Sequence, residues 1–297
     1  LRRRAMDSEV PVEMFSRMEW QQKTAWNIWA RFPGNDPELS KETLLVSSYF
    51  DANSLVPARA PGAESAVGMG ALLALADRLG REPTPRSLIL LASGAHFQDR
   101  QGIGAFLQRY MRRHPYYRAQ QLDSLNVDMF IGLDLSSQSS ELAVWDNASD
   151  FTLKRFFAPF GRRFVRYAEA VNPSVESGRE VLANGISPIR GMDWSTYMPG
   201  GLRTAGQRVF DAGHIALTLA TIFDGRQGIN SPLDQLSRVQ YANAQRQSDL
   251  ISGIVVRAAR DDSLLLAASA LRSRLKDSLR DVRFKLRTFP RRSQVPD

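Results

Sequence analysis

The chain has 297 residues, of which 43% are hydrophobic, 24% charged and 9% aromatic, with 20 Gly and 15 Pro. These proportions are typical of globular proteins and exclude disordered, collagen-like and low-complexity chains. The absence of cysteine excludes disulfide scaffolds, thiolate zinc sites and cysteine nucleophiles. The formal charge of +8 raises the question of nucleic-acid binding. However, arginine far outnumbers lysine and the basic residues are scattered, so we do not expect nucleic acid as a partner.

The sequence shows no membrane-spanning segment, because no stretch reaches the roughly 18 consecutive apolar residues of such a helix. Its most apolar run, His214 to Phe223, is too short and is typical of a buried strand. The chain opens with Leu1-Arg2-Arg3-Arg4 and ends in the linker-like stretch from Pro290 to Asp297. We therefore expect a piece of a longer protein, located in a periplasmic, extracellular or lumenal space, with membrane anchoring possible through segments outside this chain.

Hydrophobic periodicity predicts strands that alternate with helices of 10–20 residues. The expected strands, in chain order, are 19–31, Thr43–Phe50, Ser87–Ser93, Val127–Leu135, Glu141–Trp145 and His214–Phe223. The expected helices are Glu64–Leu79, Gly104–Arg113, Phe151–Val171 and Leu233–Ala259. This alternation predicts an α/β fold with a mostly parallel central sheet and helices on both faces.

The hydrophobic pattern and the charge of the sequence change at Asp261. Leucines and alanines from Leu264 to Leu279 lie on one helix face, Val282 to Arg287 alternates as a half-exposed strand does, and basic residues accumulate. We therefore divide the chain into a domain of residues 1–260 and a basic C-terminal extension, 261–297, that begins a second module.

Five segments lie where an open α/β sheet binds its ligands, at the carboxyl ends of strands. They are Tyr49-Phe50-Asp51, Pro61 to Gly68, Ser93 to Phe97, Gly132-Leu133-Asp134 and Ile229 to Asp234. With the lead-in Asn27 to Gly34, their order and spacing resemble the co-catalytic zinc aminopeptidases, the family-28 metallopeptidases. Relatives of that family include the non-catalytic ectodomains of nicastrin and the transferrin receptor. The resemblance covers about residues 19–258 and implies a three-layer α/β sandwich of the zinc-aminopeptidase type.

The resemblance also implies where the pocket residues lie. The family's first motif is His-x-Asp, in which His binds metal and Asp orients it. Here that triplet is Tyr49-Phe50-Asp51, so the imidazole is absent and its carboxylate partner remains. The family's metal-bridging Asp corresponds to Glu64, a carboxylate that is one methylene longer.

The remaining positions differ further from the family pattern. Its Glu-Glu pair, which supplies the general base and then a ligand, corresponds to His96 and Phe97. The Asp after the next strand is kept as Asp134, and the last His ligand corresponds to Asn230. One metal position would keep only Glu64, and the other only Glu64 and Asp134. Because catalytic zinc typically has three protein ligands, we predict a degenerate pocket with no metal and no cofactor.

We assign no catalytic residue. His96, at the general-base position, is either a structural histidine at a strand end or a base oriented by one of the pocket carboxylates. Buried like charges are costly, so these carboxylates need protons, hydrogen bonds or a cationic neighbour. We expect Tyr49, His96 and Asn230 to serve as the donors that replace the metal ions.

The leading functional hypothesis is a catalytically inactive, peptidase-like domain with a binding or assembly role outside the cytoplasm. Its expected partner is another protein or a peptide-like ligand. The alternative is a metal-dependent peptide or amide hydrolase with a remodelled site, for which zinc would be the cofactor. A third hypothesis is polyanion binding through the basic C-terminal segment.

Overall fold

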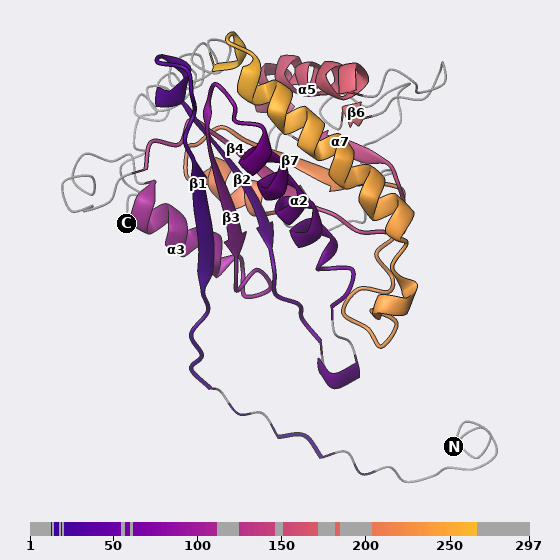
Figure 1. Ribbon diagram of the computed structural model, residues 1–297. Helices are drawn as coiled ribbons and strands as arrows, with labels where there is room; N and C mark the ends of the chain where they lie inside the picture. The colour runs from indigo at the N-terminus through magenta and orange to yellow at the C-terminus, as the bar shows by residue number, and fades with distance from the viewer. Residues whose placement is uncertain are drawn as a thin grey trace, which may run out of the picture.

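The structure, a computed structural model, describes residues 13, 15–17, 19, 21–54, 57–59, 62–111, 125–145, 151–171, 182–184 and 204–265. Within these residues seven strands form one sheet in the order β1-β3-β2-β4-β7-β5-β6 (Figure 1). They are β1 (Asn27–Phe32), β2 (Thr43–Tyr49), β3 (Ser87–Ser93), β4 (Met129–Asp134), β5 (Leu142–Trp145), β6 (Leu182–Asn184) and β7 (Ala216–Thr221). Strands β3, β2, β4 and β7 run parallel, whereas β1 is antiparallel to β3 and β5 to β7. The predicted α/β class with a mostly parallel centre is confirmed.

Helices cover both faces of the sheet. The helices on one face share a large core with the sheet, and they are α2 (Val67–Arg81), α5 (Phe151–Val171) and α7 (Tyr241–Arg260). The helices on the other face enclose a smaller core, and they are α3 (Gln101–Tyr110) and α6 (Ala205–Asp211). In the described part of the chain, no helix is long and apolar enough to cross a membrane.

The central strands are buried on both faces, as their continuous apolar runs predict. In β2, Leu44 and Val46 point into the larger core, and Leu45 points into the smaller one. This division follows from the two-residue repeat of side-chain direction in a strand.

The sequence-based boundaries are confirmed at both ends for one strand and one helix. The predicted strand Ser87–Ser93 and helix Phe151–Val171 match β3 and α5 at both ends. Four differences are larger. The strand expected over residues 19–31 begins only at Asn27, and residues 21–26 have no regular secondary structure. Strand β6 and helix α6 were missed, because segments of three and seven residues are too short to show a period. Helix α7 begins at Tyr241 instead of Leu233, because turns and a short 3₁₀ helix, Leu236–Arg238, precede it.

The core continues past the expected boundary at Asp261. Leu264 is fully buried and Leu265 is 7% exposed, and both belong to the larger core. The other residues of the predicted extension, 266–297, lie outside the described residues. The helix and strand expected there, and the division into two modules, therefore stay predictions.

Arg86 ties the end of α7 to the strands. Its side chain is fully buried, and Nη1 donates to the carbonyl oxygens of Ala258 (2.9 Å) and Asp261 (3.0 Å). Nε donates to Glu42 Oε2 at 2.8 Å. The last carbonyl groups of a helix have no partner within it, so a buried arginine that caps them stabilises the packing of α7 on the sheet.

We predict that Arg86→Met lowers the free energy of unfolding by about 3 kcal/mol, because it leaves buried carbonyl groups and Glu42 without their cation. Urea denaturation of the full chain measures the change. Arg81→Met, which removes an exposed arginine from the end of α2, is the matched control and should unfold close to the parent. Equal, small effects of both substitutions would contradict a stabilising role for Arg86.

Candidate functional site

The carboxyl ends of the parallel strands bring the predicted pocket residues to one edge of the sheet. Tyr49 and Asp134 are the last residues of β2 and β4, and His96 follows β3 by three residues. Glu64 lies in the turn before α2. The first turn of α2 packs closely on β2 at Gly68, where a side chain would not fit, because a Cβ atom there would lie only 2.4 Å from Ser48 Oγ. This close contact helps to fix the position of the turn that holds Glu64.

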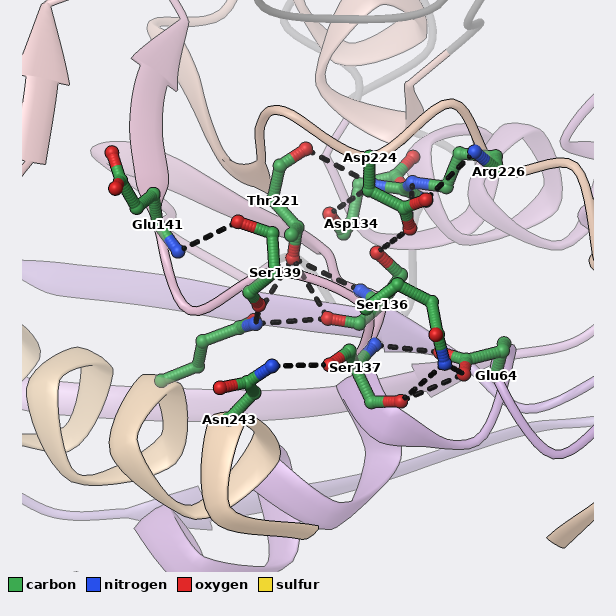
Figure 2. Close-up of polar contacts among 12 residues, drawn as sticks. Glu64, Asp134, Ser136, Ser137, Ser139, Glu141, Thr221, Asp224, Arg226 and Asn243 are labelled. Carbon is green, nitrogen blue, oxygen red and sulfur yellow. Dashed lines mark hydrogen bonds and ion pairs between the residues drawn. The ribbon is translucent and has the colours of Figure 1, made fainter. Parts of the chain in front are cut away.

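A buried ion pair lies at the centre of this edge (Figure 2). Nη1 of Arg226 donates to Asp134 Oδ1 at 2.7 Å, and the two side chains are only 8% and 4% exposed. Nη2 donates to the main-chain oxygen of Asp134 at 3.0 Å. Burial lowers the pKa of the Arg226 guanidinium, but the interactions with Asp134, Tyr49 and Asp224 together outweigh burial, so the net shift of the pKa is upward. Arg226 therefore supplies a permanent positive charge to the pocket.

The loop after β7 is shaped to direct Arg226 inward. Arg226 itself has a left-handed backbone (φ 54°), as do Phe223 and Asn230 in the same loop, a conformation that is uncommon outside glycine. The carboxylate of Asp224 accepts a hydrogen bond from the main-chain nitrogen of Arg226 at 2.9 Å and another from the hydroxyl of Ser136. Main-chain strain in this loop is thus offset by buried polar contacts.

Glu64 is surrounded by donors. Its carboxylate accepts from the main-chain nitrogen of Ser137 (2.6 Å), the Ser137 hydroxyl (2.7 Å) and the Gln138 amide (2.5 Å). Glu64 is 4% exposed, so these contacts compensate its burial without a cation. The side chain directs its oxygens to the loop that follows β4.

That loop is held in turn by α7 (Figure 2). The Gln247 amide donates to the main-chain oxygen of Ser136 at 2.8 Å, and its oxygen accepts from the hydroxyl of Thr221 at 2.9 Å. One turn earlier, Asn243 donates to the main-chain oxygen of Ser137 at 2.9 Å. The donors to Glu64 are therefore fixed by α7 and by the end of β7.

Asp234 joins two predicted pocket segments through their main chains. Its carboxylate accepts from the nitrogen of Glu64 at 2.8 Å and from the nitrogen of Asn230 at 3.2 Å. The side chain of Asp234 is buried. The loop after β7 and the turn before α2 are consequently held side by side, which places Asn230 at the same edge as Glu64.

Aromatic rings form the other side of the pocket. The rings of Tyr49 and His96 stack with their centroids 3.9 Å apart, and Phe97 packs edge-on against Tyr49 at 5.7 Å. Asp51 accepts from the main-chain nitrogen of His96 at 2.9 Å. Burial, and then the negative charge of Asp134, raise the pKa of Tyr49, so its phenol stays protonated.

His96 lacks the partner that a general base requires. Its Nδ1 atom is buried without a hydrogen-bond partner, so no carboxylate in the described part of the chain orients the imidazole. Burial lowers the pKa of His96, and the charges of Asp134 and Asp51 only partly oppose that effect. The imidazole is a packed, neutral ring in contact with Tyr49 and Phe97.

The structure brings all the predicted pocket residues to one edge, but the predicted donors were wrong. We expected the side chains of Tyr49, His96 and Asn230 to replace the metal ions. Instead, Arg226 donates to Asp134. Ser137 and Gln138 donate to Glu64. The sequence signal for this role was weak, since Arg226 is one of many arginines and lies in a loop without periodicity.

The residues present do not fit a zinc pair. Within the described ranges, no group of three or more His, Cys, Asp or Glu side chains is placed to hold a metal ion. Asp134 is paired with a guanidinium, and Glu64 accepts three hydrogen bonds. The carboxylates of Asp134 and Glu64 thus have their partners within the protein.

The fold is that of the zinc aminopeptidases. Similar solved structures include a zinc aminopeptidase, BSAP, from Bacillus subtilis (TM-score 0.53, 15% identity, 80% of this chain and 50% of that chain). An aminopeptidase from Aneurinibacillus sp. strain AM-1 gives a TM-score of 0.55 at 16% identity over 80% of this chain and 49% of that one. Nicastrin, a component of γ-secretase, gives a TM-score of 0.53 at 12% identity over 83% of this chain and 46% of that chain.

The chain spans about half the length of each of these proteins. No protein-family model and no curated protein matches its sequence. At 12–16% identity the likeness establishes the fold, and the function has to be argued from the site itself.

We predict that Arg226→Met lowers the free energy of unfolding by about 3–5 kcal/mol, because it leaves Asp134 buried without a cation. In a double-mutant cycle, adding Asp134→Asn should recover part of this loss. Denaturant titration at neutral pH measures both. Arg238→Met, in an exposed part of the same loop, should unfold close to the parent. Additive effects of the two pocket substitutions would show that the ion pair does not stabilise the protein.

A second prediction follows from the lowered pKa of His96. The unfolded chain binds a proton at this histidine near pH 6.5, and the folded chain binds it only at lower pH. Folding stability should therefore fall as the pH decreases below about 6.5. His96→Phe keeps a ring against Tyr49 and should flatten the stability curve between about pH 7 and 5. Identical slopes for the parent and the variant would contradict a buried, neutral His96.

Proposed function

We propose that this chain is a catalytically inactive aminopeptidase-fold domain with a binding or assembly role outside the cytoplasm. The observation that carries the proposal is the buried ion pair of Arg226 and Asp134. In the family that the sequence resembles, an aspartate at this position binds zinc. Here an internal guanidinium takes up the charge of that aspartate, so the pocket is neutralised by the protein itself.

The chemistry of the pocket supports the absence of metal-dependent hydrolysis. A hydrolase of this type needs a base for the attacking water and a cation that polarises the carbonyl group. The general-base position holds His96, whose ring is stacked on Tyr49, and the neighbouring ligand position holds Phe97. Arg226 cannot bind a metal ion, because a guanidinium group only donates hydrogen bonds and offers no lone pair.

The solved structures show that this fold occurs in proteins with different roles. One scaffold serves a zinc aminopeptidase and also nicastrin, a component of γ-secretase. The fold is therefore compatible with either role. We propose that the partner of this domain is another protein or a peptide-like ligand, and that membrane anchoring, where it occurs, uses segments outside this chain.

The direct test is metal analysis of the purified chain together with an aminopeptidase assay in the presence of added zinc. We expect less than one equivalent of tightly bound zinc and no cleavage of aminoacyl substrates. Two equivalents of tightly bound zinc together with cleavage would overturn the proposal and favour the metal-dependent hydrolase.

A restoration experiment tests the role of Arg226 more sharply. A guanidinium and a divalent cation a few ångströms apart repel each other by several kcal/mol, even at the effective dielectric constant of about 20 found in proteins. The substitutions Tyr49→His, His96→Glu, Phe97→Glu and Asn230→His restore the family's ligand types. We predict that they raise zinc affinity strongly only when Arg226→Ala is added, with a difference of more than about tenfold between the two variants.

Isothermal titration with zinc measures that difference. The matched control adds Arg238→Ala to the four substitutions, which also removes one positive charge from the loop and should change little. Equal affinities with and without Arg226 would show that the guanidinium does not occupy the metal position. Circular dichroism establishes that each variant is folded.

A further inference from the structure

The outer edge of strand β1 is open. Within the described ranges only β3 pairs with β1, and β1 therefore forms one margin of the sheet (Figure 1). Ile28 is 65% exposed, and Trp26, just before the strand, is 70% exposed. Large apolar side chains beside unpaired main-chain groups form a template for another strand.

The devices that usually protect such an edge are nearly absent from β1. Its pairing with β3 runs without a bulge from Asn27↔Ser93 to Phe32↔Leu88. The strand contains one charged residue, Arg31, and no proline. Natural edge strands are commonly blocked by charges, proline, bulges or short length, so this edge is suited to pairing.

The two faces of β1 differ in how well they are covered. Trp29 packs against Phe106 and Tyr110 of α3, with ring centroids 6.4 and 5.7 Å away. Ile28 and Ala30 point to the opposite face, because side chains alternate along a strand. Trp26 continues the same alternation. On that face Trp26 and Ile28 form an exposed apolar stripe along the edge.

The residues before β1 are also extended and exposed. Residues 21–26 have no regular secondary structure, all are exposed, and this segment leads away from the body of the molecule (Figure 1). Folding back onto β1 as a tight hairpin would need a turn, for which Gly, Asn, Asp or Pro are the usual residues. The sequence from Glu13 to Trp26 contains none of these four. A strand from the same segment is therefore poorly suited to cover the edge.

We propose that a second copy of this chain covers the edge, with the β1 strands of the two copies paired antiparallel about a twofold axis. Such a pairing needs only one kind of strand, because an antiparallel pair is self-complementary. With the axis near Ile28, the apolar stripes meet on one face. The two Arg31 residues then lie about 20 Å apart along the strands, at 3.4 Å per residue. The single charge of the edge does not oppose its own copy.

The net charge makes this interface different from a polyanion site. Two copies of charge +8 repel each other at long range, and salt screens that repulsion. The dimer should consequently strengthen as salt increases, whereas binding of a polyanion weakens with salt. Sedimentation at several protein and salt concentrations separates the two behaviours.

Ile28→Lys tests the proposed edge directly, because it places a charge in the middle of the pairing strand on an exposed position. We expect the dimer dissociation constant to rise by more than about tenfold. Leu73→Lys is the matched control, because Leu73 lies on α2 and is 63% exposed. It should leave dimerisation unchanged. Since the chain has no cysteine, Ile28→Cys and Leu73→Cys provide a second measurement. Only Ile28→Cys should form an intermolecular disulfide, because the two Ile28 residues face each other at the twofold axis.

A concentration-dependent dimer that Ile28→Lys dissociates and Ile28→Cys cross-links supports the proposal. A parent chain that remains monomeric at every concentration overturns it. A dimer that is insensitive to Ile28→Lys overturns it as well, because the interface then lies elsewhere. Neither result depends on the metal content or the activity of the pocket.

Discussion

The buried charge of Asp134 is the constraint around which this edge of the structure is organised. A parallel sheet directs the ends of its central strands to one place, and carboxylates that gather there cannot stay buried without compensation. A metalloenzyme compensates them with cations from solution. This chain uses the guanidinium of Arg226, 2.7 Å from Asp134, and so carries its counter-ion as part of the polypeptide.

A covalently attached cation has structural consequences that a metal ion does not have. The loop after β7 has to bring Arg226 inward, and it does so with left-handed residues and with main-chain hydrogen bonds that the carboxylates of Asp224 and Asp234 accept. Glu64 meanwhile fixes the loop after β4, which α7 contacts through Gln247. The pocket therefore joins three loops and one helix. Its carboxylates have structural partners, and their presence alone does not imply metal binding.

The fold could be predicted from the sequence to a large extent, whereas the network inside the pocket could not. The limits of strand β3 follow from its continuous apolar run, and those of helix α5 from its long periodic pattern. The places of Tyr49, Glu64 and Asp134 in the pocket followed from the resemblance of their motifs to those of the zinc aminopeptidases. The need for a donor or a cation was also evident, because buried carboxylates require one. Its identity was not, since Arg226 lies 92 residues from Asp134 in sequence and its loop has a conformation that no local pattern encodes.

The paired carboxylates of the pocket and the open edge of β1 lead to a common interpretation. In an enzyme of this fold, unsatisfied chemistry is concentrated at the strand ends, where the substrate binds. Here Asp134 is paired with Arg226, and Glu64 accepts hydrogen bonds from Ser137 and Gln138. In the described part of the chain, the outer edge of β1 is unpaired, with Trp26 and Ile28 exposed beside it. Unpaired main-chain groups and exposed apolar surface are what a protein partner recognises. The proposed binding role therefore places the contact surface at the margin of the sheet and not in the interior of the pocket.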